Sequence, residues 1–170
     1  MTTITNTTVL TNFAAIGQLD LLRQLFGQLY LPVEVYDEIR TGMAEGYTFY
    51  NNIPDLIHPF VPTGWLCLTN INDEAQLRDL KNLPANLHAG EAACLIIARH
   101  RRWLLLTDDR AARKAAAAWG IALSGTIGCL VMAVERQICS LSDANDYLRQ
   151  MSQMGYYAPY TDLTPLLHQA

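Results

Sequence analysis

Two adjacent aspartates, Asp108 and Asp109, are the strongest candidates in this sequence for a catalytic or ligand-binding role. They follow an apolar run, 104–106, and Thr107. A continuously apolar run is typical of a strand buried in a parallel sheet. Ligand sites in such sheets gather where strands end. The pair therefore has two interpretations: a cap for the helix that follows, since aspartate is a favoured N-cap, or part of a cation site.

Two glutamates lie where they could join that pair. Glu38 is about two turns into a predicted helix, and Glu91 is about one turn from the start of another, among mostly small or apolar neighbours. Carboxylates a few Å apart repel, and they stay ionised together only when a cation neutralises them. Mg²⁺ and Mn²⁺ prefer oxygen ligands and commonly pair carboxylates with a substrate phosphate. We therefore hypothesise a metal site suited to phosphodiester hydrolysis, formed by Glu38, Glu91, Asp108 and Asp109.

The alternative for Glu38 is a solvated position on a helix surface. It lies four residues after Glu34 on the same helix face, so one of these two glutamates could simply be exposed.

The periodicity of the chain predicts alternating strands and helices. The predicted strands cover 1–5, 28–31, 65–69, 103–107 and 121–123, and the predicted helices cover 9–16, 19–26, a segment after Pro32, 73–81, 87–101 with Asn86 as its cap, 111–119, 126–136 and 142–154. Such alternation predicts an α/β fold, a three-layer α/β/α sandwich around a central, mainly parallel sheet. We expect a single domain over 1–170, with an irregular, aromatic excursion at about 43–81 and a C-terminal tail from about 155.

The composition is that of a globular protein, with 51% hydrophobic and 16% charged residues in 170. A net charge of −4 argues against nucleic-acid binding by bulk charge. No apolar run approaches the roughly 18 residues of a membrane span, and the first ten residues lack the pattern of a signal peptide, so we expect a cytoplasmic protein. The four cysteines form no C-x-x-C pair, which favours buried thiols.

Five segments in order resemble the PIN-domain nucleases, in particular a PIN-like subgroup common in bacteria and archaea. They read NTTVLTNFAAIGQLDLLRQLF, YLPVEVYDEI, LHAGEAACLIIA, LLLTDDRAARKAA and GIALSGTIGCLVMA, and they extend from near the N-terminus to about Met154. The resemblance implies the same α/β/α sandwich and an endoribonuclease dependent on Mg²⁺ or Mn²⁺. It also implies an RNA substrate, a role as the toxin of a toxin–antitoxin pair with an antitoxin protein as partner, and a homodimer.

The resemblance also assigns roles to individual residues. Glu38, Glu91 and Asp109 match the acidic positions, with Asp108 as an adjacent or alternative ligand. Substrate contacts are expected from Thr7, beside Thr8, and from Thr126, Arg110 and Arg113. The two arginines share a helix face with Lys114, where they could hold phosphates, although a solvated face is the alternative.

One position departs from the family pattern. Asn6 stands where the family has its first aspartate, and an amide supplies a neutral oxygen in place of a carboxylate. Asn6 could mark a weakened or inactive relative, Asp108 could restore the missing charge, or the asparagine could be an engineered substitution. A catalytically silent module that binds RNA or protein is therefore the main alternative function. A phosphoacceptor receiver domain ranks lower, because its acidic pair would follow the first strand.

The aromatic residues outside these motifs form two groups. Both are expected to pack in the core or in a subunit interface, although exposed rings can also stack on unpaired bases. The groups are Tyr47, Phe49, Tyr50, Phe60 and Trp65 in the excursion, and Tyr156, Tyr157 and Tyr160 in the tail.

Overall fold

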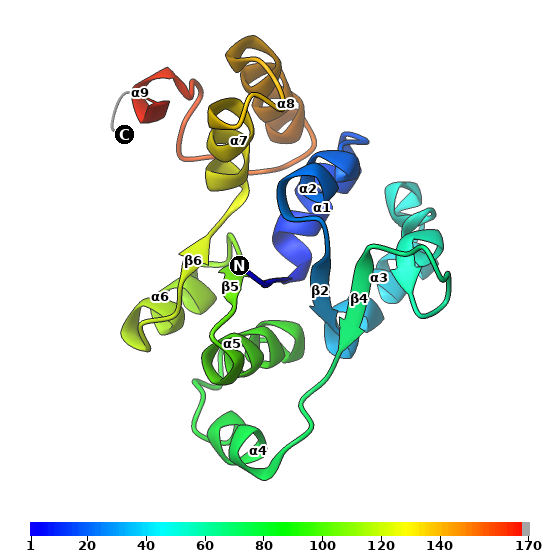
Figure 1. Cartoon of the computed structure of the whole chain (residues 1–170), viewed down its shortest axis with the longest axis vertical. Helices are drawn as coiled ribbons and strands as arrows, with labels where there is room; N and C mark the ends of the chain where they lie inside the picture. The colour runs from blue at the N-terminus through cyan, green and yellow to red at the C-terminus, as the bar shows by residue number, and fades with distance from the viewer. Residues whose placement is uncertain (168–170) are drawn as a thin grey trace.

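A six-stranded sheet forms the centre of the computed structural model, which describes residues 1–167 (Figure 1). Every strand pair is parallel, and the strand order is β3-β4-β2-β1-β5-β6. The strands are β1 (Thr3–Thr5), β2 (Leu29–Pro32), β3 (Ile57–His58), β4 (Leu66–Thr69), β5 (Leu104–Leu106) and β6 (Leu123–Ser124). The predicted parallel sheet is confirmed, and β4 is parallel to both of its neighbours.

Helices cover both faces of this sheet and complete the predicted three layers (Figure 1). One layer contains α3 (Val33–Ala44), α4 (Glu74–Leu80), α5 (Ala89–Arg101) and α6 (Arg110–Ala118). The other contains α1 (Thr7–Ala15), α2 (Leu19–Phe26), α7 (Thr126–Glu135), α8 (Leu141–Gln153) and the short α9 (Thr164–Leu167). Two 3₁₀ turns, η1 (Thr48–Tyr50) and η2 (Ile53–Leu56), lie in the excursion.

The structure corrects one predicted cap. The helix expected from residue 87 with Asn86 as its cap begins instead at Ala89, with His88 as the N-cap. The Glu91 carboxylate accepts a hydrogen bond from the His88 amide at 3.0 Å, which completes a capping box. Two elements that the sequence did not predict, β3 and α9, span only two and four residues, too few to carry a periodic pattern.

Helix α5 is the most deeply buried helix of the fold. Every residue from Ala92 to Ala98 is buried, because α5 lies between the sheet and the helices α3, α4 and α6. A helix that is apolar all round belongs inside a protein. Its first turn, which carries Glu91, is therefore fixed in place by the core.

The order of the strands fixes where a site can form. The chain moves from β1 toward β2 and β4, then returns to the other side of β1 for β5 and β6. The last residues of three neighbouring strands are in register, with Thr5 opposite Leu106 and Leu106 opposite Ser124. The strand order thus reverses between β1 and β5, which is the crevice where parallel sheets bind ligands.

We predict that the stability of the fold depends on this core, and above all on the packing of α5. Leu95→Ala, at a fully buried position of α5, should lower the free energy of unfolding by about 2–5 kcal/mol through lost burial and a residual cavity. Leu77→Ala on α4, where the side chain is 51% exposed, is the matched control and should cost less than about 0.5 kcal/mol. Urea denaturation measures both, and equal losses would contradict this account of the core.

Candidate active site

The two adjacent aspartates turn to opposite sides of the end of β5. Asp109 caps α6, and its Oδ1 accepts a hydrogen bond from the Ala112 amide at 2.7 Å. Asp108 accepts hydrogen bonds from the Thr126 backbone amide at 2.9 Å and from the Thr126 hydroxyl at 2.5 Å, with a further contact from Asn12 Nδ2 at 3.2 Å. Asp109 therefore acts as the cap that one interpretation predicted, and its charge also acts on Glu91.

Glu38 reaches this site from α3. Its Oε2 accepts a hydrogen bond from the Thr7 hydroxyl, and its Oε1 accepts one from the Gly90 amide at 3.3 Å. The carboxylate is therefore held between the first turns of α1 and α5. The solvated position considered for Glu38 is wrong, because the side chain is half-buried and points at two neighbouring helices.

Three predicted carboxylates lie near enough to one another for their charges to interact. The pKa of Glu91 is raised mainly because burial disfavours the charged form, and the negative charges of Asp109 and Glu38 raise it further. The hydrogen bond from His88 opposes this shift. Glu38, Glu91 and Asp109 therefore belong to one electrostatic cluster at the ends of β1 and β5.

Asn6 lies at the centre of a hydrogen-bond network that joins these strand ends. The side chain is only 2% exposed. Its Oδ1 accepts from the Thr8 hydroxyl at 2.8 Å, and its Nδ2 donates to the Thr107 hydroxyl at 2.7 Å. These hydroxyls in turn accept from the backbone amides of Asp108, at 3.0 Å, and of Asp109, at 3.1 Å.

An aspartate would complete the same network. Each threonine hydroxyl could then accept from one backbone amide and donate to one carboxylate oxygen of residue 6. With asparagine, the Thr107 hydroxyl accepts two hydrogen bonds, and among residues 1–167 it donates none. The surroundings of Asn6 therefore suit the aspartate of the family pattern.

A fourth acid, Glu34, also belongs to this region. Its Oε2 is buried and has no hydrogen-bond partner among the described residues. The charges of Glu38, Glu34 and Glu91, after the larger effect of burial, raise the pKa of the buried Cys94 thiol well above its usual range. Sequence reasoning left open which of Glu34 and Glu38 is exposed, and neither is. In the sequence, only the four-residue spacing of Glu34 and Glu38, which places both on one helix face, could have indicated that both turn inward.

The donor set fits a hard divalent cation. It consists of carboxylates that repel one another, together with the buried Oε2 of Glu34, which has no hydrogen-bond partner among the described residues. Mg²⁺ or Mn²⁺ would neutralise the negative charges and could bind the unpaired oxygen. Within residues 1–167, however, no group of three or more acidic, histidine or cysteine side chains is already spaced to hold a metal ion. The second oxygens of Glu91 and Asp109 accept no hydrogen bond from the described chain, so they remain available as ligands.

Asp108 has different neighbours from the other predicted ligands. Its contacts, with Thr126 and Asn12, lie on the side of α7 and the C-terminal tail. The charge of Asp108 acts on Tyr156, whose pKa is raised mainly by burial and then by Asp108. The charges of Glu38 and Asp109 thus act on Glu91, whereas Asp108 lines a neighbouring hollow.

The predicted substrate residues divide in the same way. Thr7 contacts Glu38, whereas the buried Thr126 contacts Asp108. Arg113 Nη1 donates to the carbonyl oxygens of Thr107 at 2.9 Å and of Ser124 at 3.4 Å, so this arginine ties β5 to β6. Arg110 is exposed at the start of α6.

Two motif glycines are explained by close approaches in this site. A Cβ on Gly90 would lie 2.6 Å from Glu38 Oε1, and one on Gly125 would lie 2.5 Å from Asp108 Oδ1 and 3.0 Å from Arg113 Nη1. The glycine before Glu91 and the glycine before Thr126 are therefore required by the carboxylates that approach them.

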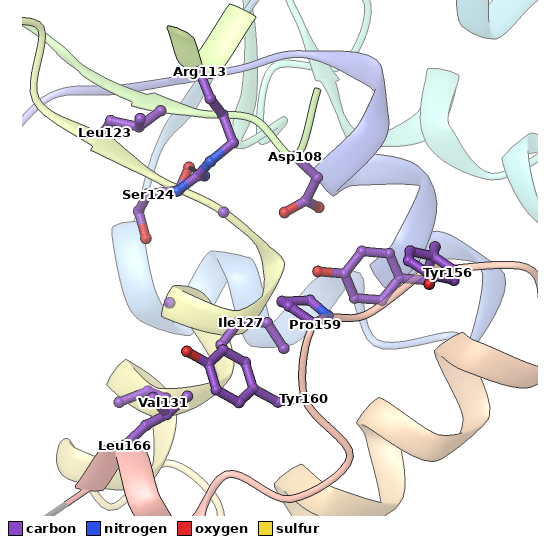
Figure 2. Close-up of a pocket in the computed structure, with 13 residues that line it drawn as sticks. Asp108, Arg113, Leu123, Ser124, Ile127, Val131, Tyr156, Pro159, Tyr160 and Leu166 are labelled. Atoms are coloured by element: carbon purple, nitrogen blue, oxygen red, sulfur yellow. Dashed lines mark hydrogen bonds between the residues drawn. The ribbon is translucent and has the colours of Figure 1, made fainter. Parts of the chain in front are cut away.

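Two hollows flank Asp108 and are separated by the C-terminal tail. The larger, about 540 Å³, lies between β6, α7 and the tail and includes Asp108, Arg113, Ser124, Tyr156 and Tyr160 (Figure 2). The smaller, about 460 Å³, includes Thr7, Thr8, Asp109, Arg110 and Tyr157. Asp108, Tyr156 and Tyr157 line both hollows, so these form neighbouring parts of one surface beside the acidic cluster.

The chain is therefore a parallel three-layer α/β domain with acidic residues near the switch point of its sheet. The PIN-domain family model matches residues 2–170, and the chain belongs to the PIN-domain family. PIN domains are generally metal-dependent nucleases, which agrees with the acidic cluster. A search of curated proteins gives no match to this chain. Over residues 1–167, none of the helices has the length and apolarity needed to cross a bilayer.

The two roles of Asp109 can be separated by substitution. Asp109→Ala should lower the free energy of unfolding by about 1 kcal/mol, because the helix cap is lost. Asp109→Asn keeps the cap and removes the repulsion from Glu91, so the free energy of unfolding should not fall. Asp73, which caps α4 through the Gln76 amide, provides the control pair Asp73→Ala and Asp73→Asn. Urea denaturation compares all four, and a loss with Asp109→Asn as large as with Asp109→Ala would contradict these roles.

The raised pKa of Glu91 predicts a specific pH dependence. The folded protein retains this proton at pH values where the unfolded chain has lost it, so the free energy of unfolding falls as pH rises through the window between the two pKa values. Glu91→Gln, which can keep the capping bond, should therefore be more stable than the parent above that window and lose this advantage below pH of about 4. Urea denaturation between pH 4 and 8 measures this, with Glu74→Gln in the first turn of α4 as the control. A difference in the free energy of unfolding between Glu91→Gln and the parent that stays constant from pH 4 to 8 would contradict a raised pKa of Glu91.

Proposed function

We propose that the chain is a divalent-metal-dependent endoribonuclease of the PIN type, weakened by Asn6, and that it acts as the toxin of a toxin–antitoxin pair. The observation that carries the catalytic part is the convergence of Glu38, Glu91 and Asp109, where the charges of two carboxylates raise the pKa of the third. Carboxylates in this arrangement gain most from a cation that neutralises them.

Glu38, Glu91 and Asp109 would hold Mg²⁺ or Mn²⁺, with the unpaired oxygen of Glu34 beside them. When bound, such an ion supplies a water of lowered pKa and a positive charge for the phosphate oxygens. The Thr7 hydroxyl and the Gly90 amide fix the Glu38 carboxylate, and the cap with Ala112 fixes Asp109. The chain thus holds its oxygen donors in place before substrate arrives, which reduces the reorganisation that the reaction requires.

RNA is the proposed substrate, and its phosphates would lie along α6. Arg110 is exposed beside Asp109, and Arg113 lines the larger hollow. Positions 110 and 113 are neighbours on one helix face, so both can serve the same strand. Contacts of this kind position a backbone without reading its sequence.

A catalytically silent PIN-like module that binds RNA or a protein is the second candidate, and Asn6 is the observation that favours it. Asn6 makes hydrogen bonds to Thr8 and Thr107 without contributing a charge to the acidic cluster. Such a site would bind a divalent ion more weakly than the family pattern, while the surfaces around it persist.

The parent chain and Asn6→Asp, assayed for cleavage of single-stranded RNA with Mg²⁺ or Mn²⁺, test the proposal. Aspartate fits the existing hydrogen bonds and restores a ligand charge, so cleavage should rise roughly 10- to 100-fold, since changes even to outer partners of metal ligands have effects of that size. In EDTA the variant should have a lower melting temperature than the parent, and Mn²⁺ should raise that temperature more in the variant than in the parent.

Two further variants make the assay specific. Asn51→Asp adds the same charge at an exposed position and should leave cleavage unchanged. Asp109→Asn in the Asn6→Asp background should abolish cleavage. Activity in Asn6→Asp but none in the parent would assign the parent to the silent class. If neither protein cuts RNA nor binds Mn²⁺, the nuclease proposal fails.

The toxin role adds two proposed partners, an antitoxin protein and a second copy of the chain. The support for both is the family alone. A short reading frame for an antitoxin beside the gene, whose product abolishes cleavage when the two are mixed, would support the toxin role. Light scattering of the purified chain would show whether it is a dimer.

A further inference from the structure

The C-terminal tail exposes aromatic rings beside the acidic cluster, so these rings do not pack in the core of the chain. Tyr157 is 96% exposed and Tyr160 is 43% exposed, whereas Tyr156 is half-buried against Asp108. Large aromatic side chains on a surface lose their hydrophobic stabilisation, so a fully exposed tyrosine contributes little to the fold.

The backbone of this tail is nevertheless fixed in position. The Tyr156 amide donates to the Met151 carbonyl at 3.0 Å, and the fully buried Leu163 anchors the following segment, with its amide donating to Asn145 Oδ1 at 2.9 Å. Tyr157 is thus presented on a segment that is tied to α8 at both ends. A ring held in this way loses less freedom on binding a ligand.

The neighbours of these rings indicate what they bind. Tyr156 and Tyr157 line both hollows, Arg110 lines one hollow, and Arg113 lines the other. Only Nη1 of Arg113 has acceptors within the described chain, so the rest of its guanidinium group remains available. Exposed aromatic rings that alternate with cations are the pattern of proteins that bind single-stranded nucleic acid.

We propose that Tyr157, which lines the larger hollow together with Tyr160, forms a stacking platform for an unpaired base of single-stranded RNA. The base would stack on the Tyr157 ring while Arg110 and Arg113 contact the flanking phosphates, which places the adjoining linkage beside Asp109. This inference rests on the proposed RNA substrate, and it specifies how the RNA strand lies on the surface of the protein. Base stacking tolerates any sequence, so the platform sets the position of the strand and not a base preference.

The test compares binding of two end-labelled single-stranded RNA oligonucleotides, measured by fluorescence anisotropy in EDTA so that no cleavage occurs. One carries all its bases, and the other has abasic nucleotides at the central positions. The parent should bind the abasic strand about tenfold more weakly. Tyr157→Ala should bind the complete strand about tenfold more weakly than the parent does, but the abasic strand almost equally well. Tyr157→Phe keeps the ring face and should restore binding to within about twofold of the parent.

Tyr47→Ala is the matched control, because Tyr47 is also an exposed tyrosine, 52% exposed, and lines neither hollow. It should leave both affinities unchanged, and all three tyrosine variants should keep the melting temperature of the parent. A loss with Tyr47→Ala in place of Tyr157→Ala would overturn the platform, as would equal losses on the complete and abasic strands or the absence of any RNA binding. Base-dependent binding through Tyr157 without cleavage in the metal assay would refute the nuclease proposal and retain the platform.

Discussion

The junction between the ends of β1 and β5 is the constraint on which the rest of this site depends. Parallel pairing places Asn6 beside Leu106, and the backbone N–H of Asn6 donates to the Leu106 carbonyl oxygen at 3.1 Å. From there, two threonine hydroxyls connect residue 6 to the amides of both aspartates. Because these groups are buried, they must be paired with one another. The positions of Asp108 and Asp109 are thus fixed by the sheet and not by the loop that carries them.

This junction also explains why adjacent aspartates perform different tasks. Successive residues of an extended backbone point to opposite sides. Asp109 therefore faces α5 and the acidic cluster, while Asp108 faces α7 and accepts hydrogen bonds from Thr126. The hydrogen bonds to Asp108 and the ties from Arg113 hold β6 and the start of α7 against β5. One aspartate serves the proposed chemistry, and the other organises the wall of the larger hollow.

The sequence alone was sufficient for the layers and the parallel sheet, because those follow from hydrophobic periodicity. The rule that strand ends meet also pointed to Glu38, Glu91 and Asp109, whose charges interact in the structure. It was not sufficient for contacts made across the chain. That Glu34 also turns inward depends on how α3 packs on α5, and the split between Asp108 and Asp109 depends on the register of β5 with β6. That Tyr157 lies outside the core of the chain could not be predicted either, since an aromatic residue in a tail carries no signal of whether a core lies near it.

The asparagine at position 6 has a structural advantage as well as a chemical disadvantage. Glu34, Glu38, Glu91 and Asp109 already bring four carboxylates to this part of the fold. Burial is the main cause of the raised pKa of Glu91, and the charges of Asp109 and Glu38 raise it further. A buried aspartate at the strand junction would add a fifth charge with almost no contact with water, so the folded state would depend more strongly on a bound cation. Asparagine makes hydrogen bonds to the same two threonines without that charge. The same substitution that weakens a metal site therefore lets the strand ends stay joined when no metal is bound.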